Sequence, residues 1–148
     1  MFRFLLLTLI AFAQCLCATQ AKAQAGMPVY VESSAPDPVG KRLVYAIREG
    51  IRRSSSMSLE DREKDGFISV RVVTLNPDDG STPVRTIYSV VWTTKTLHDT
   101  PVTMYLTNSV GLCGSAKVAE CADGLVADTD EQASFVRSIL RSIVDQNK

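Results

Sequence analysis

Two cysteines in the C-terminal half of the chain, Cys113 and Cys121, are the residues whose type and spacing best suit chemistry. Cysteine pairs serve as disulfides, as metal ligands or as redox couples. A structural zinc site needs about four ligands, but the chain has one histidine and no paired Cys-x-x-C motif. Redox motifs hold their cysteines two residues apart, and these two are separated by seven residues. The spacing therefore favours a disulfide, with two free thiols as the alternative.

A disulfide between these cysteines would constrain the backbone between them. Eight steps along an α-helix separate two Cα atoms by about 12 Å, whereas a disulfide needs them within about 7 Å. Residues 113–121 therefore cannot form one straight helix. Gly114 and Ser115 are the expected turn, because glycine permits unusual backbone angles and serine is a good cap for a helix that starts near Ala116.

Other residues have types suited to catalysis or metal binding, but their context does not favour either. His98-Asp99 sets the imidazole beside a carboxylate, yet adjacent residues in a turn seldom adopt the geometry of a catalytic dyad. The acidic segment 123–131 contains Asp-x-Asp without the rest of a calcium loop, and residues 77–80 are typical of a turn. We predict no catalytic residue, no metal site and no cofactor, and a protein that is not an enzyme.

The helix predicted over residues 39–53 carries a basic stripe. Lys41, Arg48 and Arg52 recur at spacings of seven and four, which places them on one face of a helix. Such a face can hold an anionic small ligand, a lipid head group or a cell-wall polymer. The alternative is a solvated face opposite a buried one, which every amphipathic helix needs. The candidate binding surface consists of Lys41, Arg42, Tyr45, Arg48, Arg52 and Arg53.

The N-terminus has the layout of a secretory signal peptide. One basic residue precedes an apolar run over residues 4–12, and small residues follow, so cleavage is expected near Ala23 or Ala25. The apolar run is shorter than the about 20 residues that span a membrane, and an uncleaved anchor is the alternative. Cys15 and Cys17 lack the small residues that precede a lipoprotein cysteine, so we assign both to the leader.

Removing residues 1–25 from the 148-residue chain leaves residues 26–148, which suit a single soluble domain. This part has 14 basic and 16 acidic residues, and so near-balanced a charge does not indicate nucleic acid as a partner. It contains no apolar run of membrane-spanning length. We expect a periplasmic or secreted protein, in an oxidising compartment where two cysteines pair. The sequence leaves the oligomeric state open.

Strand and helix patterns predict a two-layer α+β sandwich. Asp37 followed by Pro38 is typical of a helix start, and Thr129 with Gln132 resembles a capping box at the start of a closing helix. We expect a mainly antiparallel sheet of four to five strands, two main helices on one face, and one disulfide. The predicted strands cover residues 27–34, 57–59, 67–75, 84–95 and 102–110.

The stretch VYVESSAPDPVGKRLVYAIREGIRRSSSMSL resembles the opening of periplasmic accessory domains of the TolB N-terminal and CsgG type. Those domains begin with a strand, then Asp-x-x-Gly, then a helix that ends in serines, then a short strand. Asp37 and Gly40 occupy the matching places, and residues 54–56 supply the serines. The match covers about a quarter of the chain, and the C-terminal half departs from it. The resemblance implies assembly in the envelope without catalysis.

These observations lead to two functional hypotheses. The first is an exported, non-enzymatic domain that binds another protein of the bacterial cell envelope, with the helix 39–53 and the hairpin 67–95 as its contacts. The second is a binder of an anionic small ligand, lipid head group or cell-wall polymer through the basic face of the first helix. An enzyme is a third class, which lacks a matching set of nucleophile, base and metal ligands in the sequence.

Overall fold

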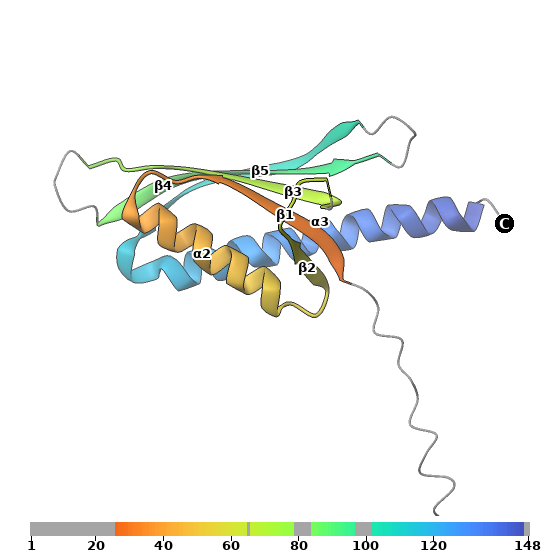
Figure 1. Cartoon of the computed structure of the whole chain (residues 1–148), viewed down its shortest axis with the longest axis horizontal. Coiled ribbons are helices and arrows are strands. Elements are labelled where there is room, and N and C mark those ends of the chain that lie inside the picture. The colour runs from red at the N-terminus through yellow and green to blue at the C-terminus, as the bar shows by residue number, and fades with distance from the viewer. Residues whose placement is uncertain (1–25, 65, 79–83, 97–101, 147–148) are drawn as a thin grey trace, which may run out of the picture.

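The computed structural model describes residues 26–64, 66–78, 84–96 and 102–146. Within these residues, five strands form one sheet, and the two α-helices pack against the same face of it (Figure 1). The predicted two-layer α+β sandwich is therefore confirmed. The strands are β1 (Met27–Ser34), β2 (Met57–Glu60), β3 (Ile68–Leu75), β4 (Arg85–Lys95) and β5 (Thr103–Gly114), and the helices are α2 (Pro38–Arg53) and α3 (Val118–Gln146), with a 3-10 turn η2 (Ser115–Lys117) before α3.

The sheet is mixed, with strand order β2-β1-β3-β4-β5. β1 is parallel to both of its neighbours, whereas β3, β4 and β5 form an antiparallel meander with longer pairings. A parallel pair needs a crossover connection, and α2 supplies it between β1 and β2. This topology places β5 at one edge of the sheet and the short β2 at the other.

Burial alternates along β3 and β4 because successive side chains of a strand point to opposite faces of the sheet. Val70, Val90 and Trp92 face the helices and are fully or almost fully buried. Leu43 and Ile47 of α2 pack into the same core. The sheet face that points away from the helices is left to solvent.

The sequence predicts a helix that starts near Ala116 and a closing helix that starts at the capping box of Thr129, but the structure has one continuous helix, α3, from Val118. Thr129 is buried inside the helix, where its Oγ1 donates to the Leu125 carbonyl at 2.7 Å and accepts from Trp92 Nε1 at 2.9 Å. The prediction failed because Val118 and Leu125 extend the buried face toward the N-terminus. A buried face of this length stabilises the helix more than a local cap does.

The predicted disulfide joins Cys113, at the end of β5, to Cys121 near the start of α3, with a Cα–Cα distance of 6.2 Å. The chain turns between them, as the sequence predicts. Gly114 has an ordinary φ of −76°, however, so the turn does not use the conformational freedom of glycine. Ser115 is the first residue of η2 rather than the cap of a helix, and its N–H donates to the Val84 carbonyl at 2.8 Å.

Reduction of this disulfide should lower the free energy of unfolding by about 2–3 kcal/mol, because the crosslink closes a short loop in the unfolded chain. Calorimetry with and without reductant measures the effect as a lower melting temperature. The double variant Cys113→Ala, Cys121→Ala is the control, and its melting temperature should not respond to reductant. An unchanged melting temperature of the wild type, with both thiols fully reduced, would contradict this prediction.

Candidate functional site

The sheet face opposite the helices carries a contiguous apolar surface, which we call the open patch. Leu75 of β3 pairs with Ile87 of β4, which pairs with Leu112 of β5, and these three side chains form a row across the strands. Val73 and Val110 flank Ser89 in the next row. The exposed fractions are 45% for Val73, 61% for Leu75, 36% for Ile87, 66% for Val110 and 57% for Leu112.

Single exposed apolar residues are normal on protein surfaces, whereas contiguous ones mark interaction sites. The open patch is contiguous because the antiparallel register brings residues from three strands side by side. Arg71 and Asn108, paired with Val91 between them, form the next row and give the patch a polar border. An apolar centre with a polar rim is the arrangement of a protein–protein interface.

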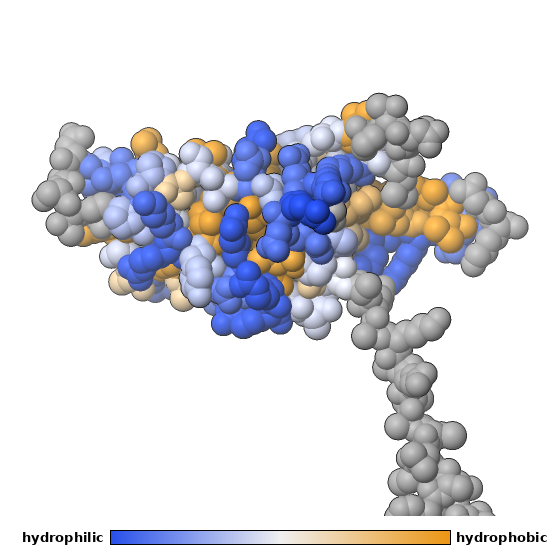
Figure 2. Space-filling view, viewed as in Figure 1, coloured by the Kyte–Doolittle hydropathy of each residue, from blue (hydrophilic) through white to orange (hydrophobic). Residues whose placement is uncertain are grey.

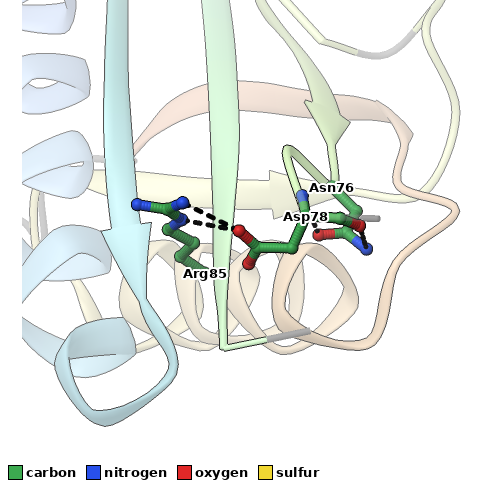
Figure 3. Close-up of polar contacts among 3 residues, drawn as sticks. All are labelled: Asn76, Asp78 and Arg85. Carbon is green, nitrogen blue, oxygen red and sulfur yellow. Dashed lines mark hydrogen bonds and ion pairs between the residues drawn. The ribbon is translucent and has the colours of Figure 1, made fainter. Parts of the chain in front are cut away.

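A polar cluster lies at the loop end of the β3–β4 hairpin, at one end of the open patch (Figure 3). Arg85 donates from Nε to Asp78 Oδ1 at 2.9 Å, and Asn76 and Asp78 exchange two hydrogen bonds of 3.0 Å that shape the turn. Asp78 Oδ2 has no hydrogen-bond partner among the residues that the structure describes. The ion pair of Asp78 and Arg85 joins the segment after β3 to the start of β4, next to the pair Leu75–Ile87.

The outer edge of β5 borders the open patch, and no strand of the described segments pairs with it. The bond from Ser115 N to the Val84 carbonyl continues the register in which Gly114 pairs with Arg85. Bonded and non-bonded pairs alternate in an antiparallel ladder, so the N–H and C=O groups that point away from β4 belong to every second residue. In the regular part of β5 these residues are Asn108, Val110, Leu112 and Gly114, and the side chains of the first three lie on the open face.

The helix layer is fixed to the sheet by a buried carboxylate, Asp37. It accepts hydrogen bonds from Gly40 N at 2.7 Å, from Thr74 Oγ1 at 2.8 Å and from Thr86 Oγ1 at 3.1 Å. Burial alone would raise the pKa of Asp37, but these hydrogen bonds outweigh burial and hold its pKa below the ordinary value. The predicted helix cap is confirmed, and the two threonines are partners that the local sequence does not reveal.

Gly40 of the Asp-x-x-Gly motif packs closely against the same group of hydrogen-bonded side chains. A Cβ atom at this position would collide with Thr74 Oγ1 and Asp37 Oδ2. The motif that resembles the TolB and CsgG domains therefore has a structural role here, since it joins the start of α2 to the end of β3 and the start of β4.

Two arginines of the predicted basic surface donate to carbonyl groups of the chain itself. Arg42 donates to the Ser115 carbonyl at 3.2 Å, and Arg48 donates to the Val31 carbonyl at 2.7 Å. The two acceptors belong to different elements, η2 and β1. These two side chains therefore contact different elements and help to hold α2 in place.

The other residues of the predicted surface lie along the solvent side of α2. Arg52 forms an ion pair with Glu49, and Tyr45 is 68% exposed. Lys41 and Tyr45 share a shallow hollow of about 410 Å³ with Arg42, while Arg53 lies at the end of the helix. The structure brings part of the predicted set together, and anion binding there stays a prediction.

A second exposed apolar stripe lies on the C-terminal part of α3, which projects past the sheet (Figures 1 and 2). Phe135, Ile139 and Ile143 recur every four residues and are 53%, 41% and 44% exposed. Of the neighbouring apolar residues, Val136 is buried and Leu140 is partly buried. Phe135, Ile139 and Ile143 are exposed because α3 is longer than the sheet that it covers.

The remaining candidates of the sequence do not form a site in the described residues. His98-Asp99 lies outside these residues. The acidic residues of segment 123–131 lie within α3, where Asp130 accepts a hydrogen bond from Ser56. Within the described part of the chain, no group of three or more His, Cys, Asp or Glu residues could hold a metal ion. No helix among those residues combines the length and apolar character needed to cross a membrane.

Comparison with known proteins does not assign a family. No protein-family model matches the chain, and no curated protein does so. Among solved structures, the rare lipoprotein B from Shewanella oneidensis matches with 15% identity and a TM-score of 0.26, covering 82% of this chain and 99% of that one. A TM-score this low establishes neither a common fold nor a common function. The resemblance to TolB-type and CsgG-type domains is not tested by these findings and stays a prediction.

Proposed function

We propose that this chain is an exported, non-enzymatic domain that binds another protein of the bacterial cell envelope through the open patch. The observation that carries the proposal is the row formed by Leu75, Ile87 and Leu112 on an uncovered sheet face. The disulfide adds support for export, because such bonds form and persist in oxidising compartments.

The shape of the open patch favours a protein over a small ligand. Small-molecule sites are concave and enclose most of their ligand. The open patch instead consists of side chains that stand on adjacent strands of a sheet face, with Val73, Ile87 and Val110 all at least one-third exposed. A partner with a complementary apolar surface would remove these side chains from water, at a gain of about 25 cal/mol per Å² of apolar area buried.

Photo-crosslinking in living cells tests the proposal. A photoreactive amino acid in place of Leu75 should form a crosslink to a discrete envelope protein, because this side chain lies in the open patch. The same amino acid in place of Tyr45, which is equally exposed but lies on α2, is the matched control and should form no such product.

A companion variant addresses the contribution of apolar contact. Ile87→Lys in the chain that carries the photoreactive residue at position 75 should abolish the crosslink, because the lysine places a charge at the centre of the apolar row. An unaltered crosslink in Ile87→Lys, or a product from position 45 alone, would refute binding through the open patch.

A further inference from the structure

Strand β5 lacks most of the features that protect edge strands from pairing with other chains. Proteins shield such edges with short strands, charged side chains, proline or bulges. β5 has 12 residues, TMYLTNSVGLCG, with no charged residue and no proline. One bulge is present at Leu106, between the pairs Trp92–Thr107 and Thr93–Tyr105, and residues 107–114 beyond it are regular. The opposite edge strand, β2, has only four residues.

We propose that β5 pairs with β5 of a second copy of this chain, in antiparallel orientation, to form a symmetric dimer with one continuous sheet. The outward-pointing backbone groups of Asn108, Val110 and Leu112 would form the new hydrogen bonds. Pairing about Val110 sets Val110 opposite Val110 of the second copy, and Leu112 opposite Asn108. In this register every outward N–H and C=O of the three residues finds a partner in the other copy.

A second copy fits this edge because the edge is complementary to itself. Asn108 and Leu112 lie two residues on either side of Val110, so a two-fold axis at Val110 sets each of them opposite the other, as a symmetric dimer requires. Like charges on directly opposite strands destabilise a sheet, but β5 carries none. Two identical strands can therefore meet without electrostatic penalty, whereas a strand rich in charges would find no countercharge along β5.

The dimer also extends the open patch. Val110 and Leu112 are the members of the patch that lie on the edge strand, and each is more than half exposed. Because residues opposite each other in a sheet lie on the same face, pairing brings the two copies of Val110 together on the open side. The inference goes beyond the proposed function, since it concerns the edge of the sheet and a second copy rather than another envelope protein.

Neither layer of the fold blocks the approach of a second strand. On the helix side, the residues of β5 beside the axis are Ser109 and Gly111, which are small. Tyr88 covers Gly111, where an added Cβ would collide with its hydroxyl oxygen. A hollow of about 390 Å³ lies between the end of β5 and α3, beside Leu112 and Gly114.

Molecular mass in solution tests the dimer. Sedimentation velocity of the purified chain at about 50 µM should give twice the monomer mass. Val110→Lys should give a monomer, with a dissociation constant raised at least about tenfold, because two lysines would meet across the axis. Val73→Lys is the matched control, since Val73 lies in the same patch but on β3. It makes the same chemical change away from the edge and should remain a dimer.

A backbone variant tests the hydrogen bonds themselves. Val110→Pro removes an N–H that points away from β4, and edge strands tolerate proline at such positions. It should keep the circular dichroism spectrum of the wild type and yield a monomer. A monomeric wild type, an equal effect of Val110→Lys and Val73→Lys, or a dimer that survives both changes at Val110 would each overturn the proposal.

The outcomes also separate this inference from the proposed function. A monomeric wild type that still forms the crosslink from position 75 would refute the dimer alone. A dimer whose position 75 forms no crosslink to another envelope protein would refute the proposed function alone.

Discussion

Replacing Trp92 by alanine should lower the free energy of unfolding by about 3–5 kcal/mol, the range for deleting a large aromatic side chain from a core. Trp92 is the largest of the fully buried side chains, with 0% exposure, and lies on the helix-facing side of β4. Its loss would leave a cavity between the sheet and α3. Since the chain has one tryptophan, denaturant unfolding of all variants is followed by circular dichroism.

Two variants of Thr129 separate the hydrogen bond of Trp92 from its packing. Thr129→Val keeps the volume but removes the oxygen that accepts from Trp92 Nε1 at 2.9 Å. A buried donor left without a partner costs about 1–3 kcal/mol, so Thr129→Val should be less stable by that amount. Thr129→Ser retains the hydroxyl group and should recover part of the loss. Equal stabilities of wild type and Thr129→Val would show that the hydrogen bond does not contribute.

Local patterns predicted those parts of the fold that depend on neighbours in the sequence. Alternation gave the strands, and the cap at Asp37 gave the start of α2. A separate helix start at Thr129 was predicted wrongly because Thr129 has the residue type of a cap, whereas its hydroxyl accepts a hydrogen bond from Trp92, which lies far away in the sequence. β5 extends past residue 110 because β4 supplies a pairing partner as far as Gly114, although the two glycines of this extension, Gly111 and Gly114, have low strand propensity.

The sequence indicates part of the open patch, but the complete patch can be recognised only when the register of the sheet is known. Toward the end of residues 68–75, apolar side chains occur on both faces of the strand. Val72 belongs to the buried face, whereas Val73 and Leu75 belong to the exposed one. This pattern indicates a strand with two apolar faces. It does not show that Ile87 and Leu112 stand beside Leu75, because pairing in register is a property of the folded sheet. The basic stripe on α2 was visible because it lies within one helix.

Asp37→Ala should lower the free energy of unfolding at pH 7 by about 3 kcal/mol, since it removes a helix cap and leaves buried donors without an acceptor. Asp37→Asn should lower it less. Asparagine keeps one oxygen for the cap, but its amide nitrogen, which cannot accept, replaces the oxygen that accepts from Thr74 and Thr86, so this variant loses those two bonds. Asp123→Asn, an exposed change on α3, is the control and should leave stability unaltered.

The difference between the wild type and Asp37→Asn should depend on pH, because hydrogen bonds hold the pKa of Asp37 in the folded protein below its ordinary value of 3.8. The ionised carboxylate therefore stabilises the folded state, and this contribution is complete above the pKa of the unfolded chain. It is lost as pH falls through the lower pKa of the folded protein. Urea unfolding at pH 7, 5, 4 and 3 should show a constant difference down to about pH 5 and a shrinking one below about pH 4. A difference that persists unchanged at pH 3 would mean that the charge of Asp37 does not join the two layers, and that capping alone explains its burial.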